Sequence, residues 1–231
     1  MSNIDVKEMM DAAMHFGHQT QRWNPKMKPF LYGSKNGIHI FDLEKTAVAM
    51  NQALEFLKQA SATGKTILLA STKPQAAKLI MEAAKETKMP YVVHKWMPGL
   101  FTNFSTIKKR IKYFNDLLEQ EKTGELEKYT KKEISRIKKE LVKLQDAFGG
   151  VREMDRLPAV VFVADVVRDR IIVDEAKKMK ITVVAITDSN ADPDGVTYPL
   201  PANDDALSSL IFVVNKVKSA IIDGRDGKKQ S

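Results

Sequence analysis

The chain has 231 residues, of which 43% are hydrophobic, so it is long enough to bury a core of its own. It contains no cysteine, which excludes disulfides and thiolate metal sites and fits a reducing compartment. It has no apolar run of about 18 residues and no secretory signal, so we expect a cytoplasmic protein without a membrane partner. Its 37 Lys and Arg against 29 Asp and Glu give a net charge of +8, which indicates a polyanionic partner.

The positive charge is concentrated in two segments. Residues 12–41 contain four basic residues and no acidic residue, and residues 105–148 contain twelve basic and eight acidic residues. Residues 149–200, in contrast, contain seven basic and nine acidic residues. Such clustering is the electrostatic pattern expected for contact with nucleic acid. The alternative is that the lysine-rich helices are simply solvated.

Short apolar runs rich in β-branched residues alternate with segments of helical period, a pattern that predicts βαβ units with buried parallel strands. We expect strands at residues 37–41, 66–71, 90–94, 159–165 and 181–188. We expect one helix from about Leu43 to Ser61 with Asp42 as its cap, another that begins near Pro74 and runs to about Thr87, and a last helix capped by Asn203. Right-handed crossovers then arrange these elements as an α/β fold, a three-layer αβα sandwich around a parallel sheet.

Residues 105–148 do not fit this sandwich and predict an antiparallel coiled-coil hairpin between the third and fourth strands. Thr123 and Gly124 supply the break between its two helices. The apolar positions, spaced three and four residues apart, are Ile107, Ile111, Phe114 and Leu118, then Ile134, Ile137, Leu141, Leu144 and Phe148. The sandwich would then consist of residues 1–104 and 149–231. The basic outer faces of the hairpin suit contact with grooved RNA, and a solvated arm or a protein-docking arm is the alternative.

The motifs that could support catalysis are incomplete. Gly64-Lys65-Thr66 resembles the end of a phosphate-binding loop, but the motif's earlier glycine is missing and the tripeptide leads into a strand. The dinucleotide fingerprint and the nucleophile elbow are also absent. We therefore expect no enzyme activity, no cofactor and no small-molecule substrate.

Two sets of side chains leave an alternative open. Asp165 and Asp188 follow strands at the edge where open α/β sheets bind ligands, so a doubly wound enzyme with a metal or nucleotide is a second hypothesis. His15 and His18, on an expected helix end, would need His39 or His94 to complete a metal site. Packed or RNA-facing histidines are the more ordinary interpretation, and we predict no metal site.

Aromatic and basic residues interleave in the string HFGHQTQRWNPKM at residues 15–27. Further motifs follow in order, namely NGIHI at 36–40, DLEKT at 42–46, GLFTN at 99–103, Gly149-Gly150, Leu157-Pro158, TDSN at 187–190 and PANDDA at 201–206. Together they closely resemble the family of the bacterial small-subunit ribosomal protein two, along nearly the whole chain. The resemblance implies a flavodoxin-like sandwich with a coiled-coil protrusion, bound to 16S rRNA between the head and body of the small subunit. It also implies other small-subunit ribosomal proteins as partners, including the large mRNA-binding ribosomal protein one.

RNA binding of this kind depends on phosphate neutralisation by Lys and Arg and on stacking of unpaired bases on aromatic rings. The first predicted contact group is Arg22, Trp23, Asn24, Lys26 and Lys28. The second group, before and along the hairpin, is Thr102, Asn103, Lys108, Lys109, Arg110, Lys112, Lys131 and Lys132. For Trp23 a place in the core is the alternative, and for the hairpin group it is contact with protein or solvent.

Overall fold

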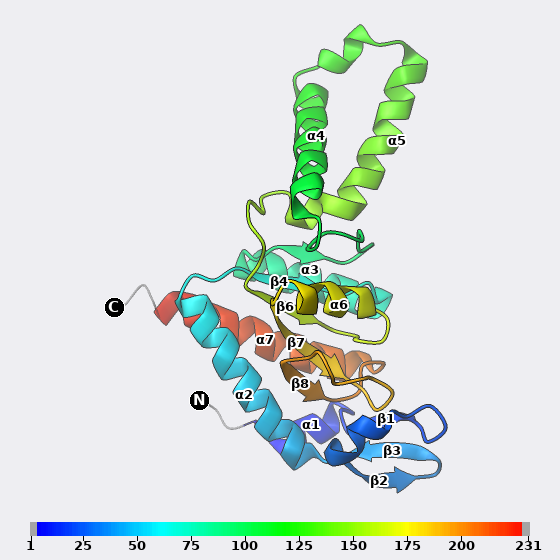
Figure 1. Cartoon of the computed structure of the whole chain (residues 1–231), viewed down its shortest axis with the longest axis vertical. Coiled ribbons are helices and arrows are strands. Elements are labelled where there is room, and N and C mark those ends of the chain that lie inside the picture. The colour runs from blue at the N-terminus through cyan, green and yellow to red at the C-terminus, as the bar shows by residue number, and fades with distance from the viewer. Residues whose placement is uncertain (1–3, 228–231) are drawn as a thin grey trace.

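The computed structural model describes residues 4–227, and the centre of the molecule is a five-stranded parallel sheet (Figure 1). The strand order is β5-β4-β6-β7-β8. The strands are β4 (Ile67–Ala70), β5 (Tyr91–Val92), β6 (Val160–Val163), β7 (Thr182–Thr187) and β8 (Tyr198–Pro201). Every residue of β4 and β6 is buried, as the continuous Val, Ile and Leu runs predict. Four of the five predicted strands therefore lie in this sheet.

Helices cover both faces of the sheet, because alternate strand residues point to opposite sides. Ile67 and Leu69 pack in one buried cluster with helices α2 (Leu43–Ala62), α3 (Pro74–Thr87) and α7 (Leu207–Gly227). Leu68 and Ala70 pack in a second cluster with α6 (Arg170–Lys178) and the base of the hairpin. The arrangement fits the predicted three-layer sandwich.

The first predicted strand was assigned to the wrong sheet. It is present as β3 (Ile38–Phe41), but it pairs antiparallel with β1 (Phe16–Gln19) and β2 (Leu31–Lys35) in a separate sheet. Asn36 and Gly37 both have positive φ, 52° and 76°, and form the tight turn between β2 and β3. A two-residue turn joins only antiparallel strands. Helix α1 (Val6–Asp11) and the short helix η1 (Pro25–Phe30) complete this region.

The two amino-terminal histidines are also placed differently from the prediction. His15 lies in a turn after α1 and His18 in β1, so neither is on a helix end.

The start of α2 agrees with the prediction. The helix begins after Asp42, whose side chain accepts a hydrogen bond from the Lys45 amide at 3.3 Å.

The segment between β5 and β6 forms two long helices that project from the sheet (Figure 1). They are α4 (Phe104–Lys122) and α5 (Lys131–Phe148), connected through η2 (Glu125–Lys128), and the short helix η3 (Gly149–Val151) follows. The buried residues of these two helices are Ile107, Ile111, Phe114, Leu117, Leu141, Leu144 and Phe148. Leu117 takes the buried place predicted for Leu118, and Ile134 and Ile137 are only half-buried. Within residues 4–227 no helix has the length and apolarity to span a bilayer.

Candidate nucleic-acid interface

The basic residues of the amino-terminal segment fall into two kinds. Arg22 and Lys28 are exposed, and neither makes an ion pair with a described residue. The ammonium of Lys26, in contrast, lies 2.6 Å from Asp194 and 2.9 Å from Asp192. Hydrogen bonds to Asp194 and Asp192 raise the pKa of Lys26 above its ordinary value. Lys26 therefore ties η1 to the loop after β7, and its charge is matched locally.

Trp23 and Asn24 are also engaged within the protein. The Trp23 ring is half-buried and lies against His39 in a tilted arrangement, with 4.9 Å between the ring centroids and 37° between the ring planes. The Asn24 side chain accepts a hydrogen bond from the Lys26 amide at 3.0 Å, and the Asn24 amide donates to the Ser189 carbonyl at 2.7 Å. Trp23 is thus neither a full core residue nor a free aromatic, and Asn24 caps η1.

The loop before α4 is held by one buried carboxylate that the sequence interpretation missed. Glu175, on α6, is only 6% exposed. Its oxygens accept hydrogen bonds from the Trp96 indole, the amides of Gly99, Phe101 and Thr102, and the Thr102 hydroxyl, at 2.7–3.2 Å. Burial opposes ionisation, but these donors hold the pKa of Glu175 below its ordinary value. Thr102 thus serves to position the hairpin, while Asn103 is exposed beside it.

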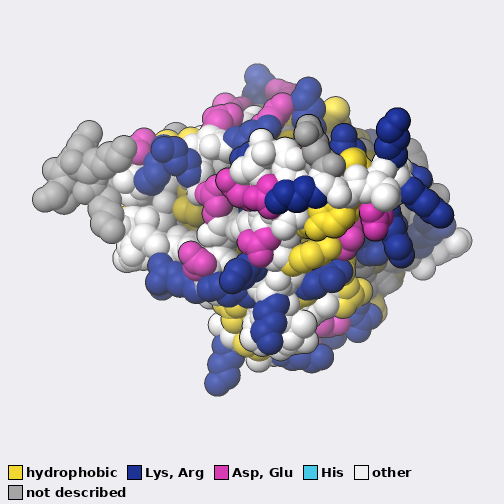
Figure 2. Space-filling model, turned by 90° about the horizontal axis from the view of Figure 1, so that it is seen from above, with side chains coloured by type: hydrophobic (Ala, Val, Ile, Leu, Met, Phe, Trp, Pro, Cys, Tyr) yellow, Lys and Arg dark blue, Asp and Glu magenta, His cyan; other side chains and the backbone are white. Residues whose placement is uncertain are grey.

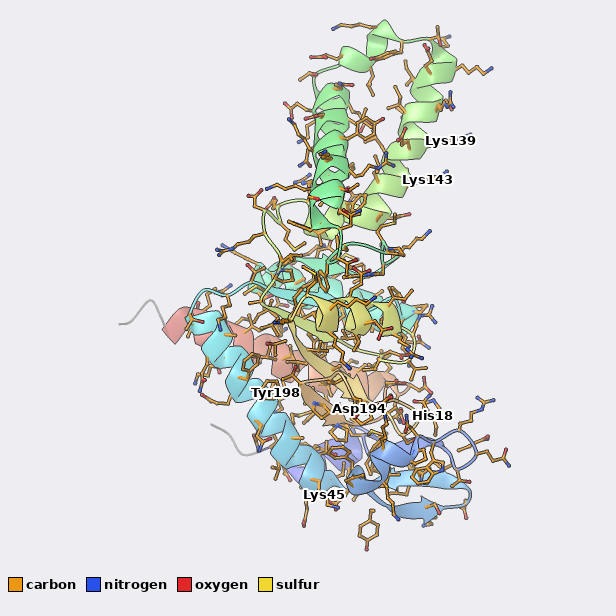
Figure 3. All side chains as sticks on the ribbon, in the orientation of Figure 1. His18, Lys45, Lys139, Lys143, Asp194 and Tyr198 are labelled. Carbon is orange, nitrogen blue, oxygen red and sulfur yellow. The ribbon has the colours of Figure 1, made fainter. Side chains whose placement is uncertain are left out.

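The basic residues of the hairpin are mostly exposed, and most of them make no ion pair within the described part of the chain. Lys108 is an exception, because its ammonium lies 3.3 Å from the Asp155 carboxylate. Arg110 lies 5.9 Å from the centre of the Tyr113 ring. The exposed basic residues without an acidic partner in the described part of the chain include Lys109, Lys112, Lys131 and Lys132. Lys139 and Lys143 continue this character along α5 (Figure 3).

Seen from above, basic side chains surround much of the outline of the molecule, with acidic side chains between them (Figure 2). The surface is thus of mixed charge rather than uniformly positive. The individual contacts of each Lys and Arg therefore decide which of them has an acidic partner and which has none.

A cluster of charged side chains lies at the carboxyl ends of the strands. Lys73 is 5% exposed, and its ammonium lies 2.8 Å from Asp204, 2.7 Å from Asp205 and 3.3 Å from Asp165. Burial would lower the pKa of Lys73, but the hydrogen bonds to Asp204 and Asp205, with the charge of Asp165, raise it above its ordinary value. Burial, with repulsion from neighbouring carboxylates, raises the pKa of Asp204 to about 7.

Asp188 is paired with His18, whose Nδ1 lies 2.9 Å from the carboxylate. The hydrogen bond to Asp188 raises the pKa of His18, while burial acts against it. Among the described residues, His18, Asp188 and Asp204 have ligand atoms within 4.8 Å of one another and could hold a cation. The other histidines that the sequence suggested as ligands are not in this group. Asp165 and Asp188, the carboxylates of the enzyme hypothesis, are both bound by protein groups.

Comparison with known proteins identifies the chain's relatives. The model of the family "Ribosomal protein S2" matches residues 9–224. The chain is 45% identical to the small ribosomal subunit protein uS2 of Coprothermobacter proteolyticus, over 99% of this chain and 85% of that protein. It is also 45% identical to uS2 of Dictyoglomus thermophilum, over 98% of this chain and 92% of that protein. A third relative, uS2 of Geotalea uraniireducens, is 45% identical over 97% of this chain and 88% of that protein.

The fold and these matches define a structural, non-enzymatic component of the small ribosomal subunit. The chain belongs to the ribosomal protein S2 family. Its place is therefore in the ribosome, in the cytoplasm, and its role is in translation. The resemblance seen in the sequence motifs is confirmed, and the hypothesis of a doubly wound enzyme is not supported.

Proposed function

We propose that this chain binds 16S rRNA in the small ribosomal subunit through two basic surfaces. The amino-terminal surface consists of Arg22, Trp23, Asn24, Lys26 and Lys28. The hairpin surface consists of Thr102, Asn103, Lys108, Lys109, Arg110, Lys112, Lys131 and Lys132. Membership of the family supports a place in the small subunit. Neutralisation of phosphates by the Lys and Arg residues of the two surfaces would supply the binding free energy.

The observation that carries the proposal is the set of exposed hairpin lysines without an acidic partner among the described residues. Lys131 and Lys132 stand out, because they occupy the first turn of α5, where the helix dipole disfavours cations. The capping box of Thr130 and Glu133 offsets this cost. Lysines at this end of a helix do not stabilise the helix. We therefore expect them to serve another purpose, which is contact with a phosphate.

Contacts within the protein divide the predicted residues by role. Arg22, Lys28 and the unpaired hairpin lysines are proposed to contact phosphates directly. The exposed edge of Trp23 is proposed to meet an unpaired base. Asn24, Lys26, Thr102 and Lys108 make contacts that mainly position these surfaces.

We also propose that residues 105–148 are a coiled-coil insertion in a flavodoxin-like sandwich made of residues 1–104 and 149–231. The buried side chains of α4 and α5 support a shared seam near the sandwich. Such an insertion would carry its lysines away from the body toward RNA.

A second role as a protein-docking arm is favoured by the outer face of α5. Val142 is 62% exposed there, in a shallow hollow that Ile134, Lys138 and Lys139 also line. This face suits a neighbouring small-subunit ribosomal protein, and the family resemblance names the large mRNA-binding protein one as a partner. Val142→Ser should weaken such a protein contact and, because it adds no charge beside Lys131, leave the affinity for 16S rRNA unchanged.

The test of RNA binding is a titration of the purified chain against 16S rRNA at rising potassium chloride. The logarithm of the affinity should fall linearly with the logarithm of the salt concentration, because binding releases counterions from the phosphates. An affinity that does not respond to salt would contradict the proposal.

A further inference from the structure

A hollow of about 620 Å³ lies at the amino ends of the strands, away from the cluster around Lys73. Its walls are the end of α3, the residues leading into β4 and β5, and the segment after the hairpin. None of the residues predicted from the sequence to bind RNA lines it. Its volume lies within the range of about 300–1,000 Å³ that is typical of ligand sites.

The rim of the hollow carries surplus positive charge. Lys85, Lys88, Arg152 and Arg156 line it, together with the acids Glu153 and Asp155. Both acids already have partners, since Glu153 lies 3.6 Å from Arg152 and Asp155 lies 3.3 Å from Lys108. Lys85, Lys88 and Arg156 are exposed and pair with no acid in residues 4–227. Three cations therefore face the hollow without a counter-charge.

The floor of the hollow is apolar, with Ala84, Met89, Pro90 and Met154 among its lining residues. Methionine side chains make favourable contacts with aromatic rings and adapt to their shape. The wall at Gly150 is fixed, because a Cβ there would lie 2.1 Å from the Tyr91 carbonyl oxygen. A flat aromatic group with an attached anion matches this combination of apolar floor and cationic rim.

We propose that this hollow receives one unstacked nucleotide of 16S rRNA. The base would lie against Met89, Pro90 and Met154, and its phosphates would lie against Lys85, Lys88 and Arg156. Lys108, on α4, contacts Asp155, which lies on the rim of the hollow. The hollow is therefore next to the hairpin surface, and the two form one continuous surface. This inference rests on the proposed function and adds a third contact to it.

The test compares particles reconstituted with the wild-type chain and with Lys88→Glu/Arg156→Glu. The matched control is Lys78→Glu, on helix α3, which ends directly before Lys88; the Lys78 side chain is 86% exposed and lies outside the hollow. Chemical probing of 16S rRNA should show one nucleotide that the wild type and the control protect and that the double variant leaves reactive. Affinity should fall about tenfold in the double variant, as expected for removing cation–phosphate contacts.

Separate variants distinguish failure of this inference from failure of the proposed function. If Lys131→Glu/Lys132→Glu weakens RNA binding but the hollow variant changes no nucleotide, the hollow is not an RNA site and the proposed function stands. If no variant alters affinity or salt dependence, the proposed function itself fails. Ultraviolet crosslinking of the wild-type particle adds a direct readout, because a crosslink from residues 88–90 or 152–156 to another protein, instead of RNA, would overturn the inference.

Discussion

The amino-terminal segment and the hairpin are both basic in sequence, yet their charges are used differently in the fold. Residues 12–41 contain no acid, but Lys26 meets Asp192 and Asp194, more than 160 residues away in the chain. The hairpin contains eight acids, and its lysines at 109, 112, 131 and 132 still have no acidic partner among the described residues. The two segments have the same net charge of +4, from 4 − 0 and from 12 − 8, so local charge counts do not show which cations are paired, because the fold supplies the counter-charges.

The largest expected effect concerns the support of the hairpin by Glu175. Glu175→Ala removes an acceptor from five donors and leaves several of them buried and unpaired. The free energy of unfolding should fall by at least about 3 kcal/mol, measured by urea denaturation. Glu175→Gln should lose less, since an oxygen acceptor remains.

The matched control for this prediction is Asp174→Ala, at the neighbouring residue, where the side chain is 57% exposed. It should change stability by no more than about 0.5 kcal/mol. Equal losses in the two alanine variants would show that Glu175 does not hold the hairpin base.

Next in size is the effect of removing hairpin charge. Lys131→Ala/Lys132→Ala should weaken binding to 16S rRNA and reduce the slope of log affinity against log salt by about two, because each lysine that neutralises a phosphate contributes about one. Filter binding over a range of salt concentrations measures both quantities. An unchanged slope would place these lysines in solvent or against protein.

A smaller effect is expected in the amino-terminal segment, where Lys26 has carboxylate partners and Lys28 has none among the described residues. Lys28→Ala should weaken RNA binding, because Lys28 is exposed and makes no ion pair with any residue that the structure describes. Lys26→Ala should stay within about twofold of the wild type, since this lysine is matched by two carboxylates. A larger loss for Lys26 than for Lys28 would reverse our assignment of free and matched charge.

The smallest predicted effect is a dependence of stability on pH. The raised pKa of His18 means that its stabilising pair with Asp188 is complete below the ordinary histidine value of 6.5 and is lost as pH rises through the raised value. His18→Gln should therefore cost more stability at acidic than at alkaline pH in thermal unfolding. His94→Gln, at an exposed histidine without an acidic partner in the described chain, is the matched control, and equal costs for His18→Gln at both pH values would count against the pair.

Local patterns predicted much of the fold, because they coincide with the forces that form each element. Buried apolar runs such as residues 67–70 predicted the parallel strands, and Asp42 predicted the start of α2. β8 was missed because Pro199 and Pro201 argue against a central strand, and prolines are tolerated where one side of a strand is unpaired. The alternation of residues 37–41 indicated a strand but carried no information on which sheet it joins.

The candidate interface was less predictable than the fold. Lysine and arginine residues are visible in the sequence, but their partners are set by tertiary packing. Glu175 gave no signal, since one acid on a charged helix resembles any solvated side chain. The hollow near Lys88 is assembled from three separate segments, and only the packed chain brings them together.

The prolines of β8 also affect how the free chain behaves before it meets a ribosome. β8 is an outer strand of the parallel sheet, and its residues 199 and 201 lack the amide hydrogen that an incoming strand would need. Edge-to-edge pairing of two copies, a common route to aggregation, is therefore disfavoured at β8, where the Pro201 carbonyl also already accepts a hydrogen bond from the Thr46 hydroxyl at 2.8 Å. This side of the free chain is therefore protected against polymerisation through its main sheet.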